Sequence, residues 1–183
     1  MSIKDKILYL LVERDLNRRV ELFLDLLNNY SSFQINDVLK DLNVKDLEQI
    51  KKINDIKLKF IILKTLCDGD DKETAKKSME LMKKHIDDCL RIDNIEDKIF
   101  ILKYIAIHSD KKTFRKAVKM LGALIKDISK IENMELQAST LRYLVIHSNE
   151  KIRKKALLQL EKIPDKGIRR TSLEYVEKMQ KYD

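Results

Sequence analysis

A nine-residue stretch occurs twice in this chain of 183 residues. The first copy, Leu102-Lys-Tyr-Ile-Ala-Ile-His-Ser-Asp110, returns 39 residues later as Leu141-Arg-Tyr-Leu-Val-Ile-His-Ser-Asn149. Apolar residues align with apolar residues and basic residues with basic ones. A fixed period of this length is typical of stacked copies of one small helical unit, so it constrains the fold more than any other feature of the chain.

The register extends in both directions from this stretch. A step of 39 residues aligns apolar, small and basic positions over three successive units without a gap. The aligned groups are Ile53, Ile92 and Ile131; Leu63, Leu102 and Leu141; Lys64, Lys103 and Arg142; Leu66, Ile105 and Leu144; Lys76, Arg115 and Lys154; Ser78, Ala117 and Ala156; Met82, Leu121 and Leu160.

Each unit is predicted to contain two helices. In the third unit Met134, Ala138, Leu141 and Val145 recur at the spacing of one helical face. Similar stripes occur throughout the chain, and residue Asn43 suggests a kink or two short helices in the third segment. The predicted helical segments are residues 3–12, 16–30, 33–53, 55–67, 71–90, 94–108, 111–129, 134–147 and 149–163, followed by a last helix to about residue 180.

Short polar stretches separate the two helices of each unit. Ser109 and Ser148 are expected to act as helix caps, since hydroxyl groups accept hydrogen bonds from the unpaired amides at a helix start. Gly69 is expected to end its helix in the left-handed backbone conformation. His108 and His147 occupy the same column, where a histidine near a helix C-terminus is electrostatically favourable.

The period, the helix pairing and the tight turns resemble those of the HEAT and armadillo-like repeat families, over residues 53–163. The inter-helix turns lack the proline that often marks a HEAT repeat. The resemblance implies an all-α fold, a right-handed α-solenoid of antiparallel helix pairs. It also implies binding through an extended surface, without naming a ligand.

We expect a single domain over residues 1–183. Residues 1–54 form degenerate N-terminal helices, residues 55–163 the regular repeats, and residues 164–183 a capping helix, because the end repeats of a solenoid have one face against water. Glycine and proline, which punctuate sheets and long loops, number only 3 and 1, and this favours an all-α fold.

The sequence also indicates in which part of the cell the protein is expected. The N-terminal sequence Met-Ser-Ile-Lys-Asp-Lys carries charges where a signal peptide needs an apolar run. No apolar stretch approaches the roughly 18 residues of a membrane span. Cys67 and Cys89 stand in unrelated contexts and predict no disulfide framework. We therefore expect a cytoplasmic protein that does not contact a membrane.

The net charge of +8 is concentrated near the C-terminus. Residues 1–110 are nearly neutral, whereas residues 111–183 contain eighteen basic and nine acidic residues. Basic side chains on the helices of this part could form a ladder that neutralises phosphates. The alternative is that lysine-rich faces are only solvated. The ladder residues are Arg115, Lys116, Lys119, Arg153, Lys154, Lys155, Arg169 and Arg170.

Two tyrosine–histidine pairs are candidates for a groove. Tyr104 and His108 lie at i and i+4, as do Tyr143 and His147, roughly opposite the apolar stripe of each helix. The alternative is that these rings pack against the neighbouring repeat. Two histidines without a Cys or His pair nearby do not make a metal site.

The sequence contains no catalytic, cofactor-binding or metal-binding constellation that predicts an enzyme. Ser109 and Ser148 follow histidines, but an oriented base and an oxyanion hole are also needed for nucleophilic catalysis. We therefore expect a non-enzymatic interaction scaffold that binds a protein partner, with no cofactor. Sequence-independent nucleic-acid binding through the basic ladder is the alternative, and a homodimer is a further option.

Overall fold

The protein is helical throughout the part that its structure, a computed structural model, describes: residues 2–13, 18, 22, 25, 29, 42, 44–53 and 55–180. None of these residues forms a strand, which confirms the all-α prediction. The predicted helix over residues 16–30 and the first part of segment 33–53 lie largely outside the described residues. Within them, no helix combines the length and the apolar character needed to cross a membrane.

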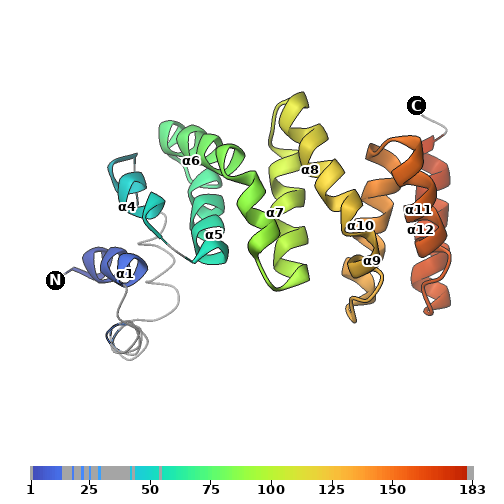
Figure 1. The fold of residues 1–183 in the computed structure, drawn as a ribbon, viewed down its shortest axis with the longest axis horizontal. Helices are drawn as coiled ribbons and strands as arrows, with labels where there is room; N and C mark the ends of the chain where they lie inside the picture. The colour runs from blue at the N-terminus through green and yellow to red at the C-terminus, as the bar shows by residue number, and fades with distance from the viewer. Residues whose placement is uncertain are drawn as a thin grey trace. The chain divides into compact units, whose positions relative to one another are not determined.

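The chain divides into two compact units, residues 1–91 and residues 92–183, which are described separately. The first unit contains a helical pair, α5 and α6, that packs side by side (Figure 1). Helix α1 contacts α4, and α4 contacts α5. The described elements of this unit are α1 (Ile3–Val12), η1 (Val44–Asp46), α4 (Leu47–Lys51), α5 (Ile56–Cys67), α6 (Lys72–Lys84) and η2 (Ile86–Arg91).

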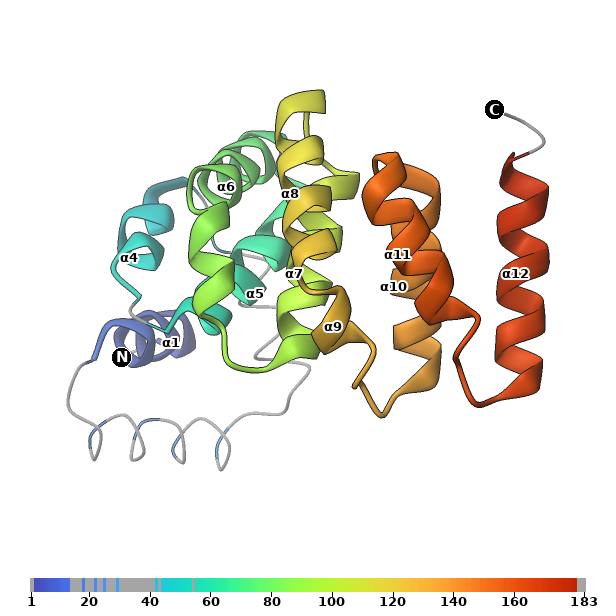
Figure 2. The same ribbon diagram turned by 45° about the vertical axis from the view of Figure 1, so that its right-hand side comes forward.

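The second unit contains two such pairs and a last helix. Helix α7 packs against α8, and α10 packs against both α11 and α12. Figures 1 and 2 show the pairs α7/α8 and α10/α11 from two directions. The elements of this unit are α7 (Ile95–Ile107), α8 (Lys111–Ala123), α9 (Ile125–Ile128), α10 (Met134–His147), α11 (Glu150–Leu160) and α12 (Lys166–Gln180).

Helix starts recur at the interval found in the sequence. Helices α5, α7 and α10 begin 39 residues apart, and so do α6, α8 and α11. The residue before each of these starts is an aspartate or asparagine whose side chain accepts a hydrogen bond from an amide of the first turn. These N-caps are Asp55, Asn94 and Asn133 for the first helices and Asp71, Asp110 and Asn149 for the second helices.

The capping prediction for Ser109 and Ser148 is wrong. Asp110 and Asn149 cap the helices, because a carboxylate or amide oxygen one residue later reaches the amides of the first turn. Ser148 instead donates to the Leu144 carbonyl oxygen at 2.5 Å, at the end of α10. The Ser109 hydroxyl is buried and has no hydrogen-bond partner within the described part of the chain.

The core is built from the residues that the period aligned. Leu63, Leu102 and Leu141 are each at most 1% exposed. The other aligned apolar and small positions are buried in the same way. They are Ile53, Ile92 and Ile131; Leu66, Ile105 and Leu144; Ser78, Ala117 and Ala156; Met82, Leu121 and Leu160. Each helix therefore buries one face and leaves the opposite face to solvent.

Two predicted helices are broken. The segment 71–90 is α6 followed by η2, with a break at His85, and the segment 111–129 is α8 followed by α9, with a break at Leu124. Each break turns the chain so that two further side chains enter the core, Ile86 and Cys89 in the first case. Residue Gly69 has no positive φ, and α5 ends on Asp68 in the right-handed conformation, so the left-handed turn was also a wrong prediction.

Helices α8 and α11 approach closely at one point. A Cβ atom added to Gly122 would lie 2.6 Å from Ile152 Cδ1 and 3.0 Å from its Cγ1 and Cγ2 atoms. Ile152 is therefore seated in space that only a glycine leaves open. The contact places the two second helices of this unit side by side.

Replacing Asp110 by alanine should destabilise the protein by about 1 kcal/mol, because its carboxylate accepts from the Lys112 and Thr113 amides at 3.0 Å. Urea unfolding followed by circular dichroism measures the change. Asp70→Ala is the matched control, since Asp70 is exposed and caps no helix. Equal stability of Asp110→Ala and the unmodified protein would contradict the capping role.

Candidate functional site

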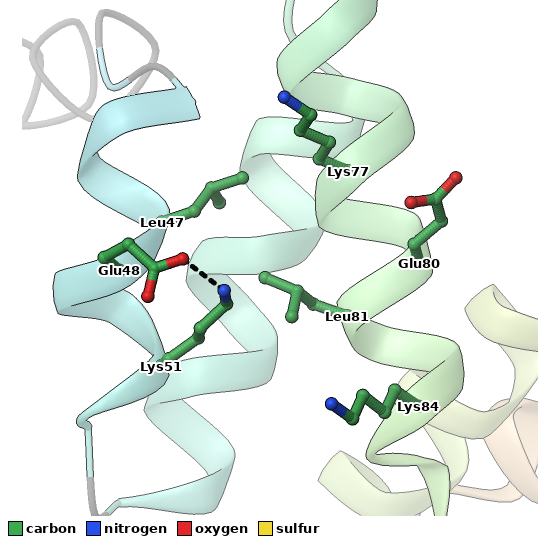
Figure 3. Close-up of a pocket in the computed structure, with 7 residues that line it drawn as sticks. All are labelled: Leu47, Glu48, Lys51, Lys77, Glu80, Leu81 and Lys84. Carbon is green, nitrogen blue, oxygen red and sulfur yellow. Dashed lines mark hydrogen bonds and ion pairs between the residues drawn. The ribbon is translucent and has the colours of Figure 1, made fainter.

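The first unit has an open hollow of about 390 Å³ between α4 and α6. Leu47 and Leu81 point toward each other across it, and charged side chains surround them (Figure 3). Glu48 forms an ion pair with Lys51, which also holds the pKa of Glu48 below its ordinary value. Lysines and glutamates both line this hollow, so it does not favour a ligand of one charge.

The second unit has a hollow of about 290 Å³ on α10 and α12 with a different character. Its position follows from the pattern of α10, which buries Ala138, Leu141, Leu144 and Val145 and leaves the opposite side open. No acidic side chain is among the described residues that line it. The lining residues are Ser139, Arg142, Tyr143, Ile146 and His147 of α10 and Tyr175 of α12.

Rings in contact and a guanidinium group form the walls of this hollow. The ring centroids of Tyr143 and His147 are 4.6 Å apart, and the Arg142 guanidinium carbon lies 5.4 Å from the centroid of Tyr175. The Phe114 ring of α8 meets His147 edge-on at 5.9 Å. An arginine over a tyrosine ring gains a cation–π attraction, which holds the guanidinium in place.

The two tyrosine–histidine pairs named from the sequence are in ring contact along their helices, with the ring planes tilted by 36° and 54°. Tyr104 and His108 have ring centroids 4.5 Å apart, close to the 4.6 Å of Tyr143 and His147. Only the second pair lines the hollow. The contact of His147 with Phe114 also shows that this histidine packs against the preceding helix pair, as the alternative interpretation expected.

Lys103 of α7 reaches across to α10. Its ammonium lies 3.4 Å from the Ser139 hydroxyl and 5.9 Å from the centroid of the Tyr143 ring. Burial, and then the charge of Arg142, lower the pKa of Lys103. Within the described part of the chain, neither Lys103 nor Arg142 has a carboxylate partner. Two cations therefore lie near each other with no carboxylate counter-ion among the described residues.

The exposed faces of α7 and α10 correspond residue by residue at the period of 39. Phe100 and Ile107 of α7 are 50% and 61% exposed, and Tyr175 of α12 is 48% exposed, values that are high for such large apolar side chains. We call this surface the aromatic–basic face. It consists of Phe100, Lys103, Tyr104 and Ile107 of α7, Ser139, Arg142, Tyr143 and Ile146 of α10, and Tyr175 of α12.

The Tyr143 hydroxyl is buried and has no hydrogen-bond partner among the described residues. Burial raises the pKa of Tyr143 to about 12. The side chain is therefore neutral at physiological pH, and it cannot act as a base there. Its ring, beside Lys103 and His147, is the part that shapes the hollow.

The basic residues named from the sequence lie mainly on the other side of the helix pairs. Those on α8 and α11 are exposed, and the contact of Gly122 with Ile152 places these two helices side by side. Lys154 is paired with Glu150 at 2.7 Å, so part of its charge is balanced. The exposed set is Arg115, Lys116 and Lys119 on α8 and Arg153, Lys154 and Lys155 on α11.

Arg169 and Arg170 have local partners. Arg169 donates to the Ile163 carbonyl oxygen at 2.8 Å, which fixes the turn between α11 and α12. Arg170 forms an ion pair with Glu174 at 3.7 Å. These two residues therefore make contacts that stabilise the start of α12.

Sequence reasoning did not single out Lys103, Arg142 and Tyr175 as a site. The column of basic residues that includes Lys103 and Arg142 was visible, but only as a marker of the repeat register. A basic residue directly after a leucine and directly before a tyrosine recurs in both helices, and this was the available signal.

Among the described residues, no group of three or more His, Cys, Asp or Glu side chains is placed to hold a metal ion. Cys67 lies 3.9 Å from Met82, sulfur to sulfur, and Cys89 is buried in the core. Comparisons with protein-family models, with curated proteins and with solved structures found no match.

Replacing Lys103 by methionine should stabilise the protein at neutral pH. The Lys103 ammonium loses its proton more readily in the folded state than in the unfolded chain, because folding lowers the pKa of Lys103. The charged form of Lys103 therefore destabilises the folded protein at neutral pH. The stability difference should shrink as the pH rises through that lowered pKa toward about 10.4, the ordinary lysine value, since the folded protein then loses the proton first.

Thermal unfolding of both proteins at several pH values from neutral to alkaline tests this prediction. Lys119→Met makes the same change on the exposed surface of α8 and should leave the stability almost unchanged. A Lys103→Met variant that is less stable than the unmodified protein at neutral pH would show that the ammonium contributes favourably to the fold.

Proposed function

We propose that this chain is a non-enzymatic interaction module of the HEAT-like helical-repeat kind, and that it binds a protein partner. The aromatic–basic face is the observation that supports this proposal. It combines exposed Phe100, Ile107 and Tyr175 with an arginine and two further tyrosines. Aromatic residues and arginine are enriched in the centres of protein–protein interfaces. Exposed large apolar side chains that gather on one face indicate a binding surface.

The repeated helix pairs support the solenoid part of the proposal. Helix starts and N-caps recur every 39 residues, and the aligned core positions have equal burial. Repeats of this kind bury their apolar faces against their neighbours, and the stack exposes an extended surface that suits a macromolecular partner. A right-handed stack of about four helix pairs is the arrangement we propose.

The chemistry of the hollow favours binding over catalysis. Its lining offers one arginine, three aromatic rings and an aliphatic side chain, and Tyr143 stays protonated at neutral pH. His147 is the described lining residue of a type that commonly serves as a general acid or base, and its ring is packed against the rings of Tyr143 and Phe114. The described side chains of this hollow suit the positioning of a ligand.

Replacing Phe100 and Ile107 together by serine should abolish binding of the protein partner. Both side chains are at least half exposed, so the double variant should remain folded, as circular dichroism checks, and should lose the apolar contacts with the partner. An affinity pull-down with the full chain should retain one partner in moderate salt, and the double variant should lose it. Leu158→Ser, at a leucine of α11 that is 55% exposed, is the matched control and should retain it.

If the double variant retains the partner protein as strongly as the unmodified chain does, the partner does not bind through the aromatic–basic face. Size-exclusion chromatography identifies the case in which the partner is a second copy of the chain, because the unmodified protein would then elute as a dimer and the double variant as a monomer. Retention of no protein by the unmodified chain would count against the proposal as a whole.

Nucleic-acid binding through the basic residues of α8 and α11 is the second candidate. The observation that favours it is the charge of the second unit, where residues 92–183 contain 20 basic and 13 acidic residues. Exposed cations on two neighbouring helices can follow a phosphate backbone and release its counter-ions. The ion pair of Lys154 with Glu150 weakens this candidate.

In that case Arg115→Glu combined with Lys154→Glu should abolish oligonucleotide binding, because two phosphate contacts become repulsive. A filter-binding titration at low salt measures it, and the affinity should fall steeply as salt is added. Lys103→Met should leave the affinity unchanged, since Lys103 lies on the opposite face of the helix pairs. Absence of any binding at low salt would exclude the second candidate.

A further inference from the structure

We propose that the hollow on α10 and α12 is a recognition pocket for an acidic side chain, which belongs to an extended segment of the protein partner. The inference rests on the proposed function, because it names the chemistry of the partner at the aromatic–basic face. The geometry that supports it places the Lys103 ammonium beside Ser139 and the Tyr143 ring, and the Arg142 guanidinium over the ring of Tyr175.

The two cations form an incomplete electrostatic arrangement. Arg142 is close enough to disfavour the charged form of Lys103, and within the described residues no carboxylate compensates either group. Like charges that are brought together in a partly buried place reduce stability unless an opposite charge joins them. A carboxylate between Lys103 and Arg142 would supply that charge.

The donors also suit a carboxylate in shape. A guanidinium group presents two parallel N–H donors that match the two oxygens of a carboxylate, and an ammonium adds a third donor from another direction. The stack of Arg142 on Tyr175 orients the guanidinium before any ligand arrives. Such preorganisation reduces the entropy that a ligand must remove on binding.

The surroundings favour a peptide over a nucleic acid. Phe100, Ile107 and Ile146 flank the two cations, and they can pack against the apolar side chains of a peptide. A phosphodiester backbone has no apolar side chains to pack in this way. It also carries one negative charge per nucleotide, and two cations would neutralise only a small part of that charge. The volume of about 290 Å³ is near the small end of the range of about 300–1,000 Å³ for ligand pockets. This size suits the insertion of side chains from a longer segment.

The lowered pKa of Lys103 is consistent with a binding role. An uncompensated lysine of lowered pKa destabilises the folded state. Functional surfaces commonly retain such groups because binding needs them. In the complex, the carboxylate should restore the ordinary preference of Lys103 for its charged form.

A peptide selection tests the proposal. A displayed library of random peptides of about twelve residues, long enough in extended form to cross three helices about 10 Å apart, is selected on the full chain. The enriched sequences should share an aspartate or glutamate between apolar residues. One enriched peptide is then synthesised with a fluorescein label, and fluorescence anisotropy measures its affinity for each variant.

Lys103→Met and Arg142→Gln should each reduce the affinity for this peptide by about tenfold or more. This is the loss expected for one charge-assisted hydrogen bond. The matched controls Lys119→Met and Arg153→Gln remove the same charges from exposed sites on α8 and α11 and should change the affinity less than about twofold at moderate salt. Replacing the acidic residue of the peptide by its amide should produce the same loss, and the loss should not add to that of Arg142→Gln.

The outcomes separate this inference from the proposed function. Enriched peptides without an acidic residue, or peptides that bind Lys103→Met and Arg142→Gln at full strength, would overturn the acidic pocket and leave a protein-binding face. Failure to enrich any peptide, with a partner still captured by the full chain, would overturn the pocket in the same way. An oligonucleotide that displaces the peptide and loses affinity in Lys103→Met would overturn it in favour of phosphate binding. Circular dichroism melting confirms that each variant is folded.

Discussion

The burial of aliphatic side chains between the two helices of each pair is the interaction on which the other features depend. Leu102, Ile105, Leu141 and Leu144 are completely or almost completely buried, and each contributes about 1.5–3 kcal/mol relative to an exposed side chain. Because one face of α7 and α10 is used in this way, the opposite face is left exposed or half-buried. The aromatic–basic face is therefore a direct consequence of how α7 and α10 pack.

Helix starts were predicted well from the sequence because their causes are local. Apolar spacing and an aspartate or asparagine cap both lie within a few residues of each start, and α7 and α10 begin within one residue of the prediction. The breaks at His85 and Leu124 were missed for the opposite reason. Ile125 and Ile128 continue the apolar spacing of α8, so periodicity cannot report that the backbone changes direction at Leu124.

The contacts of the candidate site also divide into local ones, which the sequence predicts, and contacts between helices, which it does not. The ring contact of Tyr143 with His147 follows from their spacing on one helix, and it could be predicted. The approach of Lys103 to Ser139 depends on the distance between two helices, which the sequence does not report. The contact of Arg142 with Tyr175 could not be predicted from the repeat register either, because α12 begins seven residues earlier than the period of 39 would place it.

The close contact between Gly122 and Ile152 has a consequence for how this chain can change over time. The Ile152 side chain fills the space beside Gly122, so a substitution that enlarges residue 122 needs a smaller residue at 152 to be tolerated. Related chains that keep the α8/α11 packing should therefore show paired replacements at these two sites. Such paired exchanges would preserve the spacing of the cations on the outer surfaces of both helices.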